Sequence, residues 1–334
     1  MESDKRNLYL RRNQNEIRHI KNYLLILLLG FQRLLAMQGK RILIVGFGKL
    51  GSRVAQHLSD KHEVTALKRS PVKPSDKINM CFADVTQIES LNKALLLSVN
   101  DGVDYLIYCL SPSERSEKGY RDAYLTGLKN VITKLPRPER LKHILFISST
   151  SVYKQSQGEL VDEQSICEPL NYSGKILLEA ETYLASLVVP STSIRFSGIY
   201  GGSRSRLIDQ VKQALINQES LSASPGLTNR IHEDDCVGFI CYLVKQLDEG
   251  KIIEPCYVAS DSCPVSQAEV YSYIAEQLSL TKTSYRDKKL DVSVSENSSL
   301  SRRAGSKRCV NKRMLSSGYT LKFESYKEGY KQKL

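Results

Sequence analysis

The sequence contains no tryptophan, and its eight cysteines include no C-x-x-C pair. Disulfide-scaffolded secreted domains are far richer in cysteine, so we expect reduced thiols and a cytoplasmic location. His232 and Cys236 are four residues apart, but no second pair of metal ligands accompanies them, and the five histidines form no H-E-x-x-H motif. We therefore expect no metal site.

Little net charge lies in the body of the chain. Residues 1–36 carry seven basic and three acidic side chains, residues 281–334 carry fourteen and five, and the rest sum to −1. With 334 residues, 41% hydrophobic and 25% charged, the composition is that of a globular protein. A nucleic-acid-binding body would itself be basic, so nucleic acid is disfavoured as a partner. The alternative is that basic and aromatic side chains of residues 281–334 bind single-stranded nucleic acid.

No hydrophobic run reaches the length of about 20 residues that spans a bilayer, so we expect no membrane span. The run YLLILLLGF at 23–31 follows a basic leader, as in a signal peptide, but no small-x-small cleavage site follows it. Met37 lies four residues before the first predicted strand. Two interpretations of residues 1–36 stay open: an extension that is not native because translation starts at Met37, or a peripheral membrane or partner helix.

A glycine motif stands between the first predicted strand and the first predicted helix. Residues 41–45, RILIV, are an apolar run typical of a strand buried on both faces. GFGKLG follows at 46–51, and then apolar residues at helical spacing. In a dinucleotide site the first glycine permits the tight turn, the second lets a diphosphate approach the backbone, and the third lets the helix pack on the strand. The motif therefore predicts a diphosphate-binding site; the alternative is a glycine turn that binds no ligand. The residues predicted for the binding site are Gly46, Gly48, Lys49, Leu50 and Gly51.

The second predicted strand, at 62–67, ends on a basic pair. An NAD-preferring site normally has an acid there for the ribose 2′-hydroxyl, but this chain has Lys68, Arg69 and Ser70. A guanidinium can hold a 2′-phosphate with two hydrogen bonds. We therefore predict NADP(H), with NAD(H) as the alternative, and a solvated Lys–Arg pair as the interpretation without function.

Strand and helix patterns continue to alternate along the chain. Further strands are predicted at 78–82, 104–110, 143–148 and 191–196, and helices at 91–97 and 114–134. Such repeats indicate an α/β fold with a Rossmann-type, doubly wound parallel sheet. We divide it into a dinucleotide-binding core at 37–200 and a smaller substrate-side part at 201–334, interleaved with the core. Ligands of such sheets bind at the carboxyl ends of the strands, which directs attention to Asp84, Ser111 and residues 148–150.

Taken together, several segments resemble a known family. They are GFGKLG, ADVT, ISSTSVY, RFSGIYGG, NRIHEDD and SKRCVNKRMLSSGY. In this order, over residues 40 to about 330, they look like the extended and atypical short-chain dehydrogenase/reductases of the NAD-dependent epimerase/dehydratase group. The resemblance implies an NAD(P)-dependent oxidoreductase or epimerase/dehydratase acting on a small carbonyl, hydroxyl or nucleotide-sugar-like substrate. Many relatives dimerise, so a homodimer is an open expectation.

The catalytic residues implied by the resemblance depart from the family pattern. Ser149 falls on the catalytic serine, with Thr150 beside it toward the substrate, and Lys175 falls on the lysine that holds the cofactor ribose. The family tyrosine precedes that lysine by four residues, where this chain has Asn171; Tyr172 is one position off. One residue turns a helix by about 100°. Tyr172 is therefore either the acid/base or an ordinary partly buried tyrosine, and Asn171 a substrate ligand.

Other roles follow from the same resemblance. Asp84 and Val85 match the adenine contact, unless Asp84 caps the next helix, and Phe196 and Ser197 belong to the segment that the family places beside the nicotinamide. Ser111 is a cofactor candidate because it follows a strand end. Arg230 is expected to face an anionic substrate or to form a structural salt bridge.

Two questions about function stay open in the sequence. His232 with Glu233, Asp234 and Asp235 forms either an acid/base group or, as we favour, a helix start that Asp234 or Asp235 caps. The chain as a whole is either such an enzyme or a non-catalytic NAD(P)-binding redox sensor.

Overall fold

The computed structural model describes residues 39–73, 76–286, 288–294 and 306–334. Residues Arg41–Leu334 form one compact unit, to which the following description applies. The predictions for residues 1–36 lie outside the described residues. Among the helices of the described ranges, none combines the length and the apolar character needed to cross a membrane.

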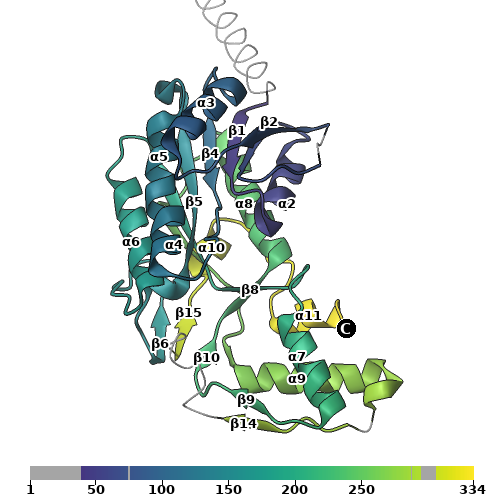
Figure 1. The fold of residues 1–334 in the computed structure, drawn as a ribbon. Helices are drawn as coiled ribbons and strands as arrows, with labels where there is room; N and C mark the ends of the chain where they lie inside the picture. Colours follow the sequence, from purple (N-terminus) through teal and green to yellow (C-terminus); the bar gives the residue numbers. More distant parts are fainter. Residues whose placement is uncertain (1–38, 74–75, 287, 295–305) are drawn as a thin grey trace, which may run out of the picture. The chain divides into compact units, whose positions relative to one another are not determined.

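A parallel sheet of seven strands forms the centre of this unit, in the order β12-β7-β5-β4-β1-β2-β3 (Figure 1). Its strands are β1 (Arg41–Val45), β2 (Glu63–Lys68), β3 (Ile78–Phe82), β4 (Tyr105–Tyr108), β5 (His143–Ser149), β7 (Ser191–Phe196) and β12 (Cys256–Ala259). In the middle of the sheet Ile42 lies opposite Val64 on one side and Tyr105 on the other. The predicted Rossmann-type fold is confirmed.

Helices cover both faces of the sheet (Figure 1). They are α2 (Lys49–Leu58) and α8 (Glu233–Asp248) on one face, and α3 (Ile88–Ser98), α5 (Gly127–Lys134) and α6 (Tyr172–Ala185) on the other. Successive side chains of a strand point to opposite faces. Accordingly Ile42 packs in one hydrophobic core and Leu43 in the other. Because both faces are buried in the middle of the sheet, β1 and β4 read as continuous apolar runs, which is why the sequence revealed them.

One predicted helix is interrupted. The stretch expected as a single helix at 114–134 begins as α4 (Glu117–Arg121) and continues through a π-helical turn at Asp122–Thr126 into α5. The Ser116 side chain accepts a hydrogen bond from the Gly119 amide and so caps its start. Short helical turns also occur; they are Pro138–Arg140, Thr150–Val152 and Thr283–Tyr285.

The later half of the chain adds smaller elements around a third hydrophobic core. These are β6 (Gln157–Val161), β8 (Gly198–Tyr200), α7 (Arg206–Asn217), β9 (Leu221–Ala223), β10 (Leu227–Thr228), β11 (Arg230–His232), β13 (Val265–Ser266), α9 (Gln267–Thr281), β14 (Val292–Val294), β15 (Ser306–Cys309), α10 (Lys312–Ser316) and α11 (Tyr326–Lys331). Two-stranded pairs form between β6 and β15, β8 and β11, β9 and β14, and β10 and β13. Helices α7 and α9 pack together, with Tyr326 and Tyr330 in their core. Strand β12 returns to the main sheet; the boundary at residue 200 stays a prediction.

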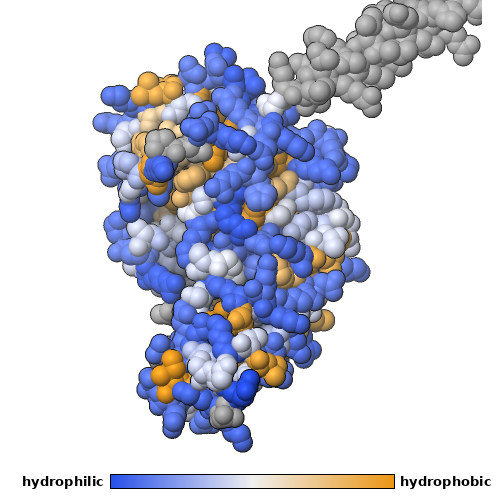
Figure 2. Space-filling view, turned by 90° about the vertical axis from the view of Figure 1, so that its right-hand side faces the viewer, coloured by the Kyte–Doolittle hydropathy of each residue, from blue (hydrophilic) through white to orange (hydrophobic). Residues whose placement is uncertain are grey.

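The surface and the sheet topology indicate where a ligand binds. Figure 2 shows a mostly hydrophilic face on which hydrophobic side chains lie in separate patches. In the sheet, β2 and β3 extend to one side of β1, whereas β4, β5 and β7 extend to the other. The carboxyl ends of β1 and β4 therefore flank the point where the strand order reverses, which is where open α/β sheets bind their ligands.

Candidate functional site

The glycine motif after β1 adopts the geometry of a dinucleotide turn. Gly46 has a φ of +104°, which favours glycine, and a Cβ there would lie 2.7 Å from the Leu110 backbone. A Cβ on Gly51 would lie 2.0 Å from the Gly46 carbonyl oxygen, so α2 packs directly on the turn. A Cβ on Gly48 would meet nothing within 4 Å. The first and third glycines are thus needed by the fold, whereas the second opens onto free space.

The start of α2 is suited to an anion. The helix begins at Lys49 after Gly48, which provides no side-chain cap, and its first turn holds no acidic residue. Backbone N–H groups at such a helix start and the positive end of the helix dipole favour a phosphate. The open side of Gly48 therefore fits the diphosphate of a nicotinamide dinucleotide.

A cavity of about 590 Å³ extends from this turn along the carboxyl ends of β1, β2, β3 and β4. Eight of the residues predicted to bind the cofactor line it: Gly46, Gly48, Lys68, Arg69, Ser70, Asp84, Val85 and Ser111. We expected these residues to line one cavity because the carboxyl ends of parallel strands meet at one edge of the sheet.

Arg69 of the basic pair lies near Asp84 in the wall of this cavity. Arg69 Nη1 lies 3.8 Å from Asp84 Oδ2, and the Arg69 side chain is 63% exposed. Partial burial raises the pKa of Asp84, but hydrogen bonds from the Thr86 amide and hydroxyl and the charge of Arg69 outweigh it and lower the pKa. Asp84 does not cap the following helix, whose N-cap is Gln87; it forms a turn with Thr86 two residues on. The Arg69 guanidinium is left accessible at the cavity edge.

The other residues predicted to bind the cofactor lie around or beneath this cavity. Leu50 and Gly51 are buried in α2, and Lys49 points to a second cavity, with Nζ 3.4 Å from the Ser203 carbonyl oxygen. Phe196 and Ser197 are buried at the end of β7, and the Ser197 hydroxyl has no hydrogen-bond partner among the described residues.

The second cavity, of about 1170 Å³, adjoins the first. Lys49 and Arg115 line the larger cavity. Their chain neighbours Gly48 and Glu114 line the smaller one. The wall of the larger cavity contains more basic than acidic side chains. The acidic residues are Asp209 and Glu219, and the basic residues are Lys49, Arg115, Arg204, Arg206, Arg230 and Lys307. Such a wall favours an anionic ligand.

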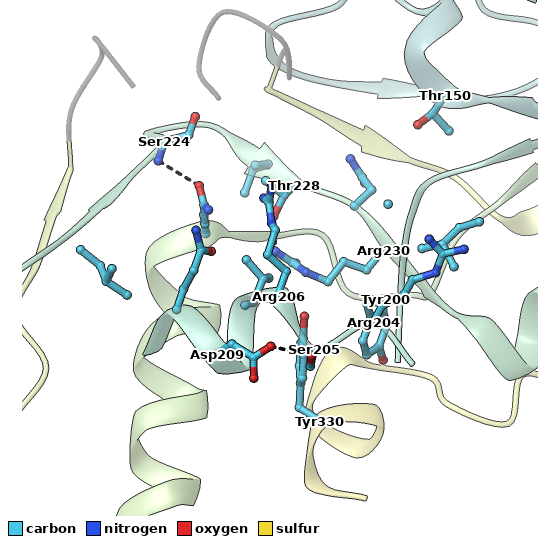
Figure 3. Close-up of a pocket in the computed structure, with 18 of the residues that line it drawn as sticks. Thr150, Tyr200, Arg204, Ser205, Arg206, Asp209, Ser224, Thr228, Arg230 and Tyr330 are labelled. Carbon is cyan, nitrogen blue, oxygen red and sulfur yellow. Dashed lines mark hydrogen bonds between the residues drawn. The ribbon is translucent and has the colours of Figure 1, made fainter. Parts of the chain in front are cut away.

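Arg230 is the predicted substrate residue in this wall. Figure 3 shows Arg206 of α7 and Arg230 of β11 extending into the same cavity. Arg230 is only 6% exposed; Nη2 donates to the Thr228 hydroxyl at 2.6 Å, while Nη1 has no hydrogen-bond partner among the described residues. Next to it, burial raises the pKa of Asp261 to about 7. A buried guanidinium with a donor left over is suited to bind an anion.

Ser149 and Thr150 also line the larger cavity. Ser149 ends β5, and its hydroxyl accepts a hydrogen bond from the Ser151 amide at 3.1 Å, which fixes the turn Thr150–Val152. Thr150 lies apart from the Arg206–Arg230 group in Figure 3. Ser149 and Thr150, predicted to contact the substrate, and Arg230, predicted to bind an anion, therefore line the same cavity.

Tyr172 and Lys175 begin α6, outside the walls of both cavities within the described part of the chain. The Tyr172 hydroxyl donates to the Arg115 carbonyl oxygen at 2.8 Å, and its ring packs edge-on against Tyr120. Lys175 is exposed. Asn171 caps α6 by accepting a hydrogen bond from the Gly174 amide at 2.9 Å. The catalytic and ribose-binding roles of Tyr172 and Lys175, and the substrate role of Asn171, stay predictions.

A buried network behind Ser149 was missed by sequence reasoning. Arg195 of β7 and Glu181 of α6 form an ion pair, with Nη2 2.6 Å from Oε2 and both side chains 8% exposed. Ser148 donates to Glu181, and Arg195 Nη1 donates to the Tyr153 hydroxyl at 2.7 Å. Burial lowers the pKa of Arg195, but the hydrogen bonds and charge of Glu181 outweigh it and raise the pKa. The Tyr153 hydroxyl is thus held inside the protein.

The start of α8 corrects one prediction. Neither Asp234 nor Asp235 caps the helix; His232 does, with Nδ1 accepting from the Asp234 amide at 3.2 Å. Burial lowers the pKa of His232. Asp235 instead accepts hydrogen bonds from the amides of Lys322 and Phe323 and so fastens the C-terminal segment to α8.

Comparisons with known proteins agree with this geometry. Residues 46–221, more than half of the chain, match a family described as NAD(P)H-binding. Protein YeeZ of Escherichia coli K12 is 27% identical over 256 residues, which are 74% of this chain and 87% of YeeZ. A candidate NAD-dependent epimerase/dehydratase from Methylobacillus flagellatus is 33% identical, with a TM-score of 0.68, over 87% of this chain and 96% of that one.

A more distant solved structure shows the same fold. The enzyme WbmG of Bordetella bronchiseptica, in complex with NAD, has a TM-score of 0.70 at 17% identity over 88% of this chain and 92% of its own. The chain belongs to the NAD(P)H-binding family, with the fold of the NAD-dependent epimerase/dehydratases in the extended short-chain dehydrogenase/reductase group.

Proposed function

We propose that the protein is an NADP(H)-dependent oxidoreductase or epimerase/dehydratase-like enzyme that acts on a carbonyl or hydroxyl group of a small anionic substrate. The observation that carries the proposal is the junction of two cavities: one lined by the glycine turn, the other by Ser149, Thr150 and basic side chains. A hydride donor in the first would meet a polarised substrate group in the second.

The cofactor would be held by groups of the smaller cavity. The amides at the start of α2 would bind the diphosphate, and Arg69 with Lys68 would bind the 2′-phosphate. A bound nicotinamide supplies hydride transfer, and the protein supplies orientation and a proton donor. Ser149 would hydrogen-bond the substrate oxygen.

The charge of the larger cavity supports an anionic substrate. Arg230 offers an unpaired buried N–H, and Arg206 reaches into the same space. A phosphate or nucleotide-sugar-like diphosphate would satisfy both guanidinium groups with charge-assisted hydrogen bonds. The cytoplasmic location, the homodimer and the absence of a nucleic-acid partner stay predictions of the sequence.

The experiment is a cofactor titration followed by a turnover screen. NADPH and NADH fluorescence titrations measure affinity, and NADPH consumption is then followed with aldehydes, ketones and nucleotide sugars. Micromolar NADPH binding with turnover of an anionic compound is the expected result. Failure to bind either cofactor would refute the proposal.

The second candidate function, a redox sensor, is favoured by the position of Tyr172 and Lys175 outside both cavity walls in the described ranges. Tight cofactor binding without turnover on any compound of the screen would support it.

A further inference from the structure

Lys307 is a buried lysine in the wall of the larger cavity. Its residue is 8% exposed, and Nζ donates to the Tyr153 carbonyl oxygen at 3.1 Å. Among the described residues it forms no ion pair within 4 Å, in contrast to the buried Arg195. Lysines are almost never fully buried unless paired, so an unpaired one in a cavity wall points to function.

The strand that carries Lys307 is fixed on both sides. Asn229 Nδ2 donates to the Lys307 carbonyl oxygen at 2.9 Å, and Asn229 Oδ1 accepts from the Cys309 amide at 2.8 Å. On the other side, β15 pairs with β6, where Lys307 lies opposite Glu159. The ammonium is therefore held at a defined position.

That position is next to the segment predicted to polarise the substrate. Tyr153, whose carbonyl oxygen binds Nζ, directly follows the turn Thr150–Val152, and its amide donates back to the Thr150 carbonyl oxygen. Ser149, Thr150 and Lys307 line the same cavity. A substrate oxygen near Ser149 would thus lie in the cavity whose wall also holds Lys307.

Both tyrosines of this region direct their hydroxyls elsewhere. Tyr172 donates to the Arg115 carbonyl oxygen. Tyr153 donates to the Asp162 carbonyl oxygen, accepts from Arg195, and has its pKa raised by burial. A general acid must reach the proton's destination within about 3 Å, and these hydroxyls are engaged with protein groups.

We propose that Lys307 is the proton-transfer residue of this site, in the role that a tyrosine has in the family pattern; this rests on the proposed function. In carbonyl reduction the Nζ–H bond breaks and its proton forms the O–H bond, while the carbonyl carbon accepts a hydride from the reduced nicotinamide dinucleotide. One carbonyl, one reduced cofactor and one proton give an alcohol and the oxidised cofactor. The neutral amine regains a proton from water, and in the reverse direction it accepts the hydroxyl proton.

The environment of Lys307 favours this chemistry. Burial lowers its pKa, against smaller opposing effects of Cys309 and Glu159. A lysine whose pKa lies below its usual range releases and regains a proton more readily than an ordinary lysine.

The first test measures Lys307 directly and needs no substrate. The full chain is labelled with ¹³C at the lysine side chains, the Lys307 signal is assigned by its loss in Lys307→Met, and its chemical shift is titrated by NMR. We expect titration below the ordinary lysine range. Titration at or above that range would overturn the proposal.

The second test separates proton transfer from charge. Lys307→Arg keeps the positive charge but cannot release a proton near neutrality, whereas Lys307→Met lacks both. With the substrate from the NADPH-consumption screen, we expect kcat to fall by roughly 100-fold in both variants. The NADPH affinity should stay unchanged, and the matched control Lys312→Met, at an exposed lysine that begins α10, should keep full turnover.

Other outcomes contradict the inference in distinct ways. Full activity of Lys307→Arg would show that Lys307 contributes only a positive charge for substrate binding. Loss of turnover in Tyr172→Phe would show that Tyr172, and not Lys307, transfers the proton. Circular dichroism of each variant excludes unfolding as the cause, and if Lys307→Met does not fold, the arginine variant still decides. Failure of the wild-type chain to bind NADPH or NADH would instead refute the proposed function.

Discussion

Gly48→Ser should raise the stability of the protein slightly and impair cofactor binding. Gly48 is the N-cap of α2, its φ of −91° suits any residue, and a Cβ there meets no atom within 4 Å. Serine caps a helix better than glycine by a few tenths of a kcal/mol, and loss of glycine flexibility in the unfolded chain adds roughly 0.4–1 kcal/mol. The free energy of unfolding should therefore rise by about 0.7–1.3 kcal/mol.

Cofactor affinity should change in the opposite direction. The added side chain points into the space that a diphosphate would use above the start of α2. We expect the affinity for NADPH and for NADH to fall at least tenfold, which corresponds to a loss of about 1.4 kcal/mol of binding free energy. Urea unfolding gives the first quantity, and fluorescence titration of the cofactor gives the second.

The comparison variant is Gly51→Ala, whose Cβ would lie 2.0 Å from the Gly46 carbonyl oxygen and 2.8 Å from Cys109 Sγ. It should unfold at much lower denaturant concentration. If Gly48→Ser binds NADPH as tightly as the wild type, the diphosphate does not lie at this turn, and the account of the smaller cavity is wrong.

Three further predictions follow from charged side chains. Arg69→Met should weaken NADPH binding about tenfold and leave NADH binding almost unchanged, measured by parallel titrations; equal losses would refute the 2′-phosphate contact. Glu181→Gln should lower the free energy of unfolding by about 3–5 kcal/mol, because it leaves the buried Arg195 charge unpaired; a loss below 1 kcal/mol in urea unfolding would contradict this. Burial raises the pKa of Asp261 from 3.8 to about 7, so the folded state binds the additional proton and this group lowers stability as pH rises between those values. Asp261→Asn should therefore gain stability relative to the wild type from pH 4 to pH 8, and a difference independent of pH would show that Asp261 ionises normally.

The sheet was largely predictable from the sequence because most of its strands are buried on both faces. Strands predicted at 78–82 and 191–196 match β3 and β7, and glycine spacing located the turn after β1. The seventh strand, β12 (Cys256–Ala259), was not predicted, because it joins the sheet beside β7 only after a long excursion through the smaller elements.

The candidate site was predictable where it depends on strand ends and not where it depends on tertiary contacts. Arg69 and Asp84 follow adjacent strands, so their common cavity follows from parallel topology. The burial of Lys307 depends on Asn229 and on pairing between β15 and β6, which are far apart in the sequence. Likewise, the cap of α8 by His232 gives no sequence signal, because aspartate is the usual capping residue and two aspartates follow.

The most direct test of the central claim is a crystal structure of the protein with bound NADPH. The account predicts the diphosphate against the amides that open α2, the 2′-phosphate beside Arg69, and the nicotinamide facing Ser149 and Lys307. A dinucleotide seated away from the glycine turn, or a nicotinamide ring directed away from the larger cavity, would contradict it.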